Sequence, residues 1–357
     1  MEVKNKEEKP FVSVVMTLFN MERTIRECLE SLLNVDYPKD RYEIIIVDGE
    51  STDKTREIIE SYAKKHKNPK IKLFIKKGYI GSGRNEGVKH AKGDFIAITD
   101  GDMVVSTGWI KELLRGFEDE RIIGVGGPNN SAEGTLFTKT ISCLDIHGPC
   151  NDVVPLLGKN KYSKPFKSNT DIYTTVCRNS CYRKSIFEEL KGFDERLVAT
   201  EDPEWNQRIL NLGHWLAYNP QAVVLHHHRS TVKSFFKQQR NYAVGQAIVN
   251  KFHPEMFKPV QILPLTGAIF ILALLLFSFV APLFFYILLI IIVFYLLLYL
   301  VYGLRCAHLK KDMRIVPTMV LAVILWHSAW VVGYAKGLSS RKKVEKGLGY
   351  GIKAHSE

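Results

Sequence analysis

Short apolar runs alternate with amphipathic stretches along the first hundred residues. Each apolar run is typical of a buried strand; the runs are FVSVVMTLFN (11–20), YEIIIVDGES (42–51), IKLFIKK (71–77) and DFIAITDGD (94–102). The stretches between them, such as MERTIRECLESLLN (21–34) and STDKTREIIESYAKKH (51–66), carry apolar residues at helical spacing. Strands that alternate with helices predict an α/β domain with a mostly parallel sheet and helices on both faces.

The pattern changes in the last third of the chain. There is no charged residue from Pro259 to Leu304, and none from Ile315 to Ala335. A helix needs about 20 apolar residues to span a bilayer, so the first stretch accommodates two helices with a turn near 278–282. The sequence therefore predicts three apolar membrane segments, at about 259–280, 282–304 and 315–335.

These segments divide the chain into a soluble domain, residues 1–250, and an α-helical membrane region, residues 251–357. The N-terminus, MEVKNKEEKP, is too charged for a signal peptide, so the first domain is expected in the cytosol. Three full crossings would leave the basic tail from Lys336 to Glu357 outside, against the positive-inside rule. We expect the first two segments to span, and the third to lie at the interface or re-enter, which keeps the tail cytosolic.

The net charge of +12 raises the question of nucleic-acid binding. The excess lies in residues 228–258, 305–314 and 336–357, which all flank the apolar segments. Basic residues beside membrane segments attract anionic lipid headgroups. The charge therefore predicts contact with membrane lipids and not with nucleic acid.

Polar residues stand where the predicted strands end. Asn20, Asp48 and the pair Asp100 and Asp102 follow three different strands. Ligands of parallel α/β sheets bind at the carboxyl ends of the strands, so these residues are expected to converge on one site. Taken singly, Asn20 and Asp48 are also typical turn or helix-cap residues.

The segment GSGRNEG (81–87) contains three glycines but lacks the G-x-G-x-x-G spacing of dinucleotide-binding folds. It also follows the third predicted strand and not the first. A nicotinamide-dependent enzyme is therefore excluded.

Four motifs occur together, in this order: TLFN, VDGESTDKT, GRNEGVKHAKGDFIAITDGD and CYRKSIFEELKGFDERLVATEDPEWNQRILNLG. In combination they resemble the inverting family-2 glycosyltransferases with a Rossmann-like GT-A fold, over about residues 10–245. The C-terminal apolar segments, with WHSAWVVGYAKG in the last, are similar to those of membrane-anchored bacterial and archaeal members. The resemblance implies a nucleotide-sugar donor and a lipid-linked or glycan acceptor.

The resemblance assigns the D-x-D carboxylates, Asp100 and Asp102, to a divalent cation, Mg²⁺ or Mn²⁺, that bridges the two phosphates of the donor. It implies nucleotide-binding residues at Thr17, Phe19, Asn20, Asp48, Arg84, Asp100 and Gly101. Some relatives carry a further polar ligand where this chain has Val104. His226, followed by His227 and His228, is the alternative ligand; LHHHR is otherwise a strand end with solvent-facing histidines.

The E-D pair of ATEDPEWNQRI supplies the expected catalytic residues, with Asp202 as the base that takes the acceptor proton and Glu201 beside it. A compatible interpretation is a helix capped by Thr200. KQQRNYAVGQ (237–246) resembles the Q-x-x-R-W element of polysaccharide synthases. Its counterparts, expected to contact acceptor or pyrophosphate, are Gln239 (or Gln238), Arg240 and Tyr242. The alternative for Arg240 is that it forms only part of the basic juxtamembrane belt.

The predicted function is inverting, metal-dependent sugar transfer to a lipid-linked saccharide or polyprenyl phosphate, at the cytosolic face of a prokaryotic plasma membrane, by a multi-pass protein. Three apolar segments are few for a polymer-secreting channel, which favours single additions over processive synthesis. The alternatives are a processive polysaccharide synthase, an inactive membrane-tethered binding or scaffold protein, and a nucleotidyltransferase.

Overall fold

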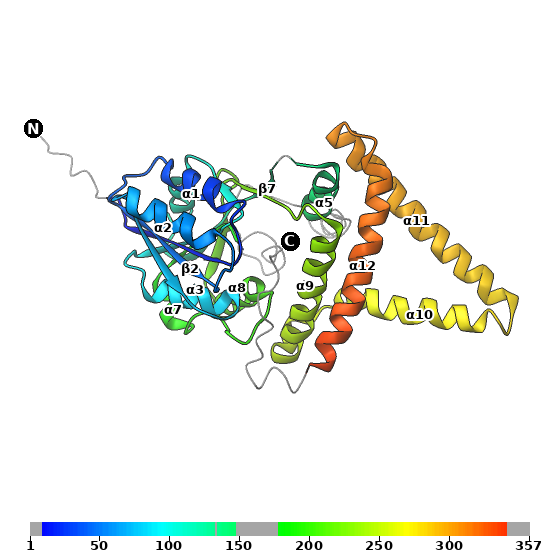
Figure 1. Ribbon diagram of the computed structural model, residues 1–357. Helices are drawn as coiled ribbons and strands as arrows, with labels where there is room; N and C mark the ends of the chain where they lie inside the picture. The colour runs from blue at the N-terminus through cyan, green and yellow to red at the C-terminus, as the bar shows by residue number, and fades with distance from the viewer. Residues whose placement is uncertain (1–8, 133, 148–177, 341–357) are drawn as a thin grey trace, which may run out of the picture.

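A computed structural model gives the fold of residues 9–132, 134–147 and 178–340. An α/β domain is followed by long C-terminal helices, two of which extend away from it (Figure 1). The fold class expected from the sequence is confirmed.

The α/β domain is built on a seven-stranded sheet with the order β3-β2-β1-β4-β8-β6-β9. The strands are β1 (Val12–Leu18), β2 (Tyr42–Asp48), β3 (Lys70–Ile75), β4 (Phe95–Asp100), β6 (Ile122–Gly126), β8 (Ser180–Arg183) and β9 (Trp215–Tyr218). Only β8 runs antiparallel to its neighbours in this sheet. A second sheet has the order β5-β10-β7, formed by β5 (Met103–Val105), β7 (Asn129–Ser131) and β10 (Val224–His226).

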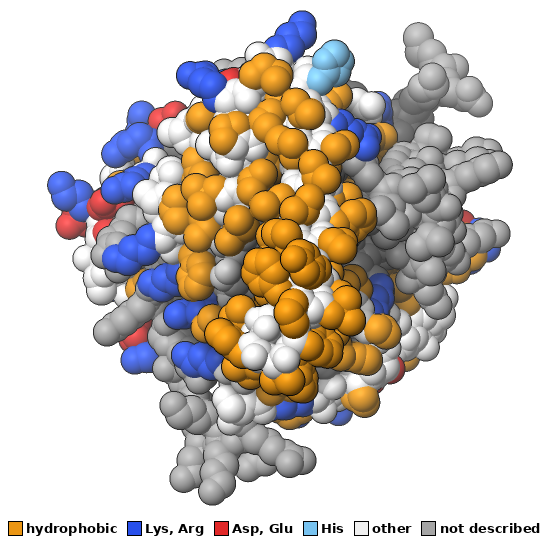
Figure 2. Space-filling view, turned by 90° about the vertical axis from the view of Figure 1, so that its right-hand side faces the viewer, with side chains coloured by type: hydrophobic (Ala, Val, Ile, Leu, Met, Phe, Trp, Pro, Cys, Tyr) orange, Lys and Arg blue, Asp and Glu red, His pale blue; other side chains and the backbone are white. Residues whose placement is uncertain are grey.

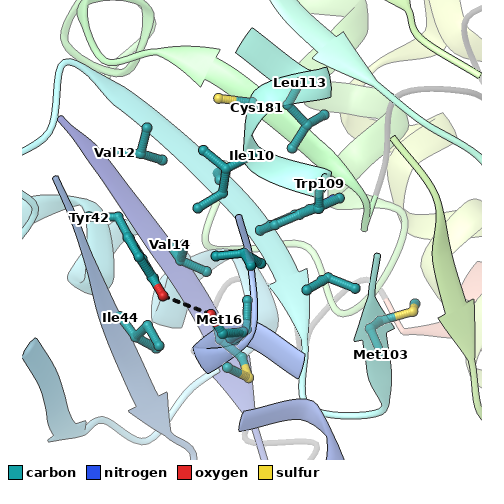
Figure 3. Packing of buried hydrophobic residues seen from close by; sticks show 14 of the residues in the cluster. Val12, Val14, Met16, Tyr42, Ile44, Met103, Trp109, Ile110, Leu113 and Cys181 are labelled. Carbon is teal, nitrogen blue, oxygen red and sulfur yellow. Dashed lines mark hydrogen bonds between the residues drawn. The ribbon is translucent and has the colours of Figure 1, made fainter. Parts of the chain in front are cut away.

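Helices cover both faces of the large sheet. They are α1 (Ile25–Leu33), α2 (Thr55–Lys65), α3 (Ile80–Lys89), α4 (Trp109–Arg115), α7 (Ser185–Glu189) and α8 (Glu201–Asn211). Side chains alternate along β1, so Val14 and Met16 pack with α1, α2 and α4, while Val15 packs with α3, α7 and α8. Figure 3 shows the first of these cores, with Trp109 and Ile110 of α4 beside the strand residues.

Helix α3 lies unusually close to β1 because two of its residues have no side chain. A Cβ on Gly83 would lie 2.4 Å from Thr17 Cγ2, and one on Gly87 would lie 2.5 Å from Val15 Cγ1. The backbone of α3 can therefore rest against the strand. Arg84 follows Gly83 in α3, so this contact places Arg84 at the end of the sheet.

The C-terminal part consists of α9 (Val232–Phe252), α10 (Leu263–Phe277), α11 (Pro282–Lys310) and α12 (Ile315–Ser339), with short 3-10 turns at Pro254–Met256 and Pro259–Gln261. Helix α5 (Leu136–His147), from the middle of the chain, packs against α11 and α12. Helices α9 and α12 run side by side next to the α/β domain, whereas α10 and α11 project from them (Figure 1). The turn expected near 278–282 is present between α10 and α11.

The lengths of these helices correct one expectation. In the described part of the chain, α11 and α12 are the helices long and apolar enough to cross a membrane. Helix α10 has 15 residues, or about 22 Å, which is shorter than the ~30 Å hydrocarbon core. Helix α10 is thus shorter than the segment expected at about 259–280, and whether that segment spans stays a prediction. The basic tail beyond residue 340 lies outside the described residues.

Candidate active site

Parallel strands bring the predicted polar residues to one edge of the sheet. In the strand register, Leu18 lies beside Asp48, and Thr17 lies beside Asp100. The loops after β1, β2 and β4 therefore begin next to one another, at the carboxyl edge where ligands of such sheets bind.

Asp102 is buried, and its surroundings are unusual for a carboxylate. Its Oδ1 has no hydrogen-bond partner among the described residues. Its Oδ2 lies 3.6 Å from Nε2 of His226 and 3.9 Å from Nη2 of Arg229. His226 is itself buried at the end of β10. The interpretation of LHHHR as a strand end is correct, but His226 does not face solvent.

The two following histidines have other contacts. His227 Nε2 lies 3.1 Å from Glu27 Oε2, and His228 Nε2 lies 2.6 Å from Ser131 Oγ. Of the three histidines, His226 alone lies within 4 Å of an aspartate of the D-x-D motif in the described ion pairs.

Arg84 joins the D-x-D motif to the E-D motif. Its side chain is 1% exposed, and its Nη1 bonds Asp202 and lies 3.2 Å from Glu201 Oε1. Its Nη2 lies 3.5 Å from Asp100 Oδ1. One buried cation thus faces three carboxylates, and this leaves an excess of negative charge at the edge of the sheet.

The carboxylates differ in their affinity for protons. Burial raises the pKa of Asp100 to about 6, although Arg84 opposes the rise. Burial, together with the charge of Asp202, raises the pKa of Glu201 to about 7. Burial acts in the same direction on Asp102, but His226 and Arg229 outweigh it, so the pKa of Asp102 falls below its usual range. Such divergent values are typical of functional sites.

The E-D pair begins helix α8, as expected, but the cap is different. Thr200 occupies the N-cap position with φ of 67°, a left-handed conformation that strains a β-branched residue. Its hydroxyl bonds Ala199 O and makes no cap bond to α8. The expected Thr200 side-chain cap is therefore wrong. The backbone strain accompanies the turn that directs Glu201 and Asp202 toward Arg84.

Asn20 and Asp48 hold the loop after β2. Asn20 Oδ1 accepts a hydrogen bond from Thr52 N at 2.8 Å. Asp48 is fully buried and accepts from the backbone N–H and the hydroxyl of Ser51, and Arg56 Nε lies 3.2 Å from its Oδ2. These contacts give both residues the turn-stabilising role that their types favour; nucleotide binding by either stays a prediction.

A cavity of about 320 Å³ lies beside the D-x-D motif. Its wall includes six of the predicted residues, which are Thr17, Phe19, Asp100, Asp102, Arg240 and Tyr242. Gln238 lines it too, whereas the buried Gln239 does not. The lining does not include the other predicted residues, which are Asn20, Asp48, Arg84, Gly101, Glu201, Asp202 and His226.

Four cationic residues in the cavity wall were not predicted for the site. They are Arg178, Arg229, Lys237 and Lys336. Arg178 and Arg229 act electrostatically on Asp102. Arg229 directly follows the three histidines, and Lys237 lies next to the Q-x-x-R-like segment, so both stood beside recognised motifs. Lys336 comes from α12, a segment expected only to contact the membrane.

The described residues contain no group of three or more His, Cys, Asp and Glu side chains arranged to hold a metal ion. Two carboxylates of the D-x-D motif nevertheless face the cavity, and Asp102 Oδ1 is buried without a partner. A hard divalent cation could take these oxygens and complete its shell with ligand and water oxygens. The residues therefore fit a metal that binds together with a phosphate-bearing ligand.

Comparisons with known proteins identify the family of this chain. The family model described as glycosyl transferase family 2 matches residues 13–191. The chain is 30% identical over 282 residues to a Methanococcus voltae protein named dolichyl N-acetyl-alpha-D-glucosaminyl phosphate 3-beta-D-2,3-diacetamido-2,3-dideoxy-beta-D-glucuronosyltransferase, covering 76% of this chain and 84% of the relative. It is 32% identical over 262 residues to the probable glycosyltransferase YdaM of Bacillus subtilis, covering 71% and 60%.

Among solved structures, a mannosyltransferase from Pyrobaculum calidifontis in complex with GDP-mannose and Mn²⁺ matches with a TM-score of 0.55. The match covers 95% of this chain and 88% of the other at 16% identity, and it reflects a shared GT-A fold. Fold, sequence and family model agree, and the chain belongs to glycosyltransferase family 2.

Proposed function

We propose that this glycosyltransferase transfers a sugar, with inversion of configuration, from a nucleoside diphosphate sugar to a hydroxyl of a lipid-linked saccharide. The transfer takes place at the cytosolic membrane face. One observation carries the proposal. The D-x-D and E-D carboxylates meet around Arg84, beside a cavity walled by both the α/β domain and α12. The carboxylates assigned to the reaction and the apolar helix α12 therefore meet at one cavity.

The donor would bind in the cavity with its diphosphate beside Asp100 and Asp102. Arg178 and Arg229 in the cavity wall supply positive charge for phosphate oxygens. Asp100 and Asp102, with His226 near Asp102, are the residues that would hold Mg²⁺ or Mn²⁺; when bound, the ion neutralises charge on the departing nucleotide. The mannosyltransferase of the same fold was solved with such an ion and a nucleotide sugar.

Asp202 would accept the proton of the acceptor hydroxyl. Here its carboxylate is held by Arg84, which also faces Asp100. Arg84 Nε and Nη2 have no hydrogen-bond partner within the described segments, so a diphosphate beside Asp100 would compete for this cation. We infer that donor binding draws Arg84 toward the phosphates and frees the Asp202 carboxylate to take the acceptor proton.

The acceptor class is inferred from three features. The cavity wall carries apolar as well as basic residues, and Lys336 comes from an apolar helix. The Methanococcus relative is named for transfer to a dolichyl-linked sugar phosphate. A hydroxyl acceptor needs a base, which Asp202 provides, whereas a polyprenyl phosphate would not.

The test is turnover by the full-length chain in membranes or nanodiscs, with UDP-, GDP- and dTDP-linked sugars, Mn²⁺ and a polyprenyl-linked saccharide extract. We expect one donor to yield free nucleoside diphosphate together with a lipid product enlarged by one sugar. Release of pyrophosphate would identify a nucleotidyltransferase instead. Long polymers would identify a processive synthase, and no turnover with any donor would favour a scaffold.

A further inference from the structure

Helices α10 and α11 leave the α/β domain side and converge on a common tip (Figure 1). Most of their large apolar side chains are exposed. Figure 2, which faces this side of the molecule, shows a broad apolar band with lysine and arginine at its margins. A soluble monomer rarely exposes such a large apolar surface, so the two helices require an apolar environment.

The tip of this hairpin is apolar as well. Phe279 is 85% exposed and Val280 is 80% exposed. The polar side chain of the turn, Ser278, bonds Leu275 O of its own helix. A hairpin that crossed a bilayer would put its turn among headgroups or in water on the far side. The side chains of this turn fit hydrocarbon instead, and the backbone N–H groups of Phe279, Val280 and Ala281 donate to carbonyls at the end of α10, as an environment without water demands.

The shorter arm limits how deep the tip can reach. Helix α10 has 15 residues, which gives it a length of about 22 Å, and a hydrocarbon core is ~30 Å thick. Helix α11 is longer, with 29 residues, but it shares the tip with α10 and returns obliquely to the start of α12 (Figure 1). The hairpin is therefore too short to emerge on the opposite side.

Helix α12 is long and apolar, but it packs against α9. A Cβ on Gly333 would lie 2.2 Å from Arg240 O of α9, and one on Gly337 would lie 2.6 Å from Ala247 Cβ. The backbones of α9 and α12 are therefore in contact. Hydrogen bonds add to this contact, from Asn250 Nδ2 to Tyr334 OH at 2.9 Å and from Lys251 Nζ to Gly337 O at 2.8 Å.

Helix α9 cannot enter the hydrocarbon core with α12. It carries Lys233, Lys237, Arg240 and Lys251, and burying such charges in a bilayer is costly. Because α12 is fixed along α9, α12 stays at the membrane surface. The end of α11 is fixed there too, since Tyr302 OH donates to Cys143 O of α5 at 2.7 Å.

We propose that α10 and α11 form a re-entrant hairpin that enters the bilayer and leaves it on the same side, with its tip in the hydrocarbon core. In this arrangement α12 lies in the headgroup plane, between the hairpin and α9. Exposed basic residues at the end of the hairpin, Lys310, Lys311 and Arg314, face anionic headgroups. The proposal concerns attachment alone and stands independently of the proposed reaction.

This geometry replaces the expected multi-pass arrangement with attachment from one side. Ser339, at the end of α12, then lies on the side of the α/β domain. It also puts the cavity at the lipid surface, because Lys336 of α12 lines it. A lipid-linked molecule could reach the cavity without leaving its leaflet.

Single cysteines with a membrane-impermeant maleimide test the proposal in the full-length chain. The background replaces only Cys150 and Cys177 by Ser, because Cys28, Cys143, Cys181 and Cys306 are buried and free. Val280→Cys probes the tip, and Ser339→Cys probes the end of α12. Ser61→Cys, on an exposed position of α2, reports the side of the α/β domain. All three replaced side chains are exposed, so none leaves a cavity.

In spheroplasts we expect no labelling of any variant from outside. In inside-out vesicles we expect Ser339→Cys and Ser61→Cys to react, and Val280→Cys to react only after detergent is added.

Labelling of Val280→Cys from outside would show a spanning hairpin, and labelling of Ser339→Cys from outside would show that α12 crosses. Labelling of Val280→Cys in inside-out vesicles without detergent would show that the hairpin is not in the bilayer; protection of that cysteine in detergent would indicate a second copy as its partner. Each of these four results would overturn the proposal.

Discussion

Arg84 contacts carboxylates from two distant parts of the chain, Asp100 after β4 and the pair Glu201 and Asp202 in α8. It is buried, so its ion pairs, and not water, offset part of this negative charge. Removing one partner of a buried ion pair leaves the others uncompensated, which is more damaging than losing an exposed pair. The stability of the site therefore depends on this arginine as much as its chemistry does.

We predict that Arg84→Met lowers the free energy of unfolding by about 3–5 kcal/mol, because three carboxylates lose their buried cation. Thermal unfolding in detergent, followed by circular dichroism, measures the effect. Arg115→Met is the matched control: Arg115 pairs with Glu112 but its side chain is 69% exposed, so a change within about 0.5 kcal/mol is expected. Equal melting temperatures for the two variants would contradict this role of Arg84.

Asp102 is the second residue whose replacement is informative. We expect Asp102→Asn to abolish Mn²⁺-dependent donor binding while the fold persists, because the change removes a charged ligand and creates no cavity. Calorimetry with Mn²⁺ and the nucleotide sugar measures both affinities. Asp40→Asn, an exposed carboxylate, should bind as the natural chain does. Unchanged affinities in Asp102→Asn would remove Asp102 from the metal assignment.

Residue types and strand ends were enough to predict part of the site. Asp100 and Asp102 follow a buried strand, and the rule for parallel sheets brings them to the correct edge. The contact between Arg84 and Asp202 joins residues 118 positions apart and depends on how closely α3 rests on β1. No periodicity in the sequence encodes that distance. Arg178 and Lys336 were missed for the same reason.

At the scale of elements, the pattern of apolar residues predicted the strands and helices of the first hundred residues correctly, but not the sizes of the C-terminal helices. The turn before Pro282 was predicted, but α10 begins only after the 3-10 turn at Pro259–Gln261, and α11 continues to Lys310, past the charged residues that ended the predicted segment. Hydropathy also reports composition and not neighbours. It could not distinguish a helix in lipid from α12, which packs along α9.

The contact between α9 and α12 should control the cavity, since both helices line it. Gly333→Ala would push a methyl group against Arg240 O. We expect this change to cost about 1–3 kcal/mol of stability and to slow transfer at least about tenfold, because residues of α9 are displaced. Melting temperature and initial rate measure the two effects.

Gly267→Ala provides the control for this experiment. It is the same substitution inside α10, where nothing lies within 4 Å of the added Cβ. We expect normal stability and activity there. If both alanine variants behaved alike, the packing of α12 on α9 would have no bearing on the cavity.

At the scale of the whole molecule, a GT-A domain is joined to a basic, apolar C-terminal part through α9 and α12. The cavity lies where these parts meet, and its wall takes residues from both. The reaction proposed for this site needs a water-soluble donor and a lipid-bound acceptor, and the arrangement gives each its own approach. We propose a matching division of roles, in which the D-x-D pair serves the donor and the E-D pair serves the acceptor.

The most direct test of this account is the single-turnover transfer rate of Asp202→Asn, measured in nanodiscs with saturating nucleotide sugar, Mn²⁺ and a lipid-linked hydroxyl acceptor. Because a base acts only as the acceptor proton leaves, we expect donor affinity to stay within a few-fold of the natural chain while transfer falls by about 10²- to 10⁴-fold. Transfer at nearly the natural rate with donor bound would contradict the assignment of Asp202 as the base.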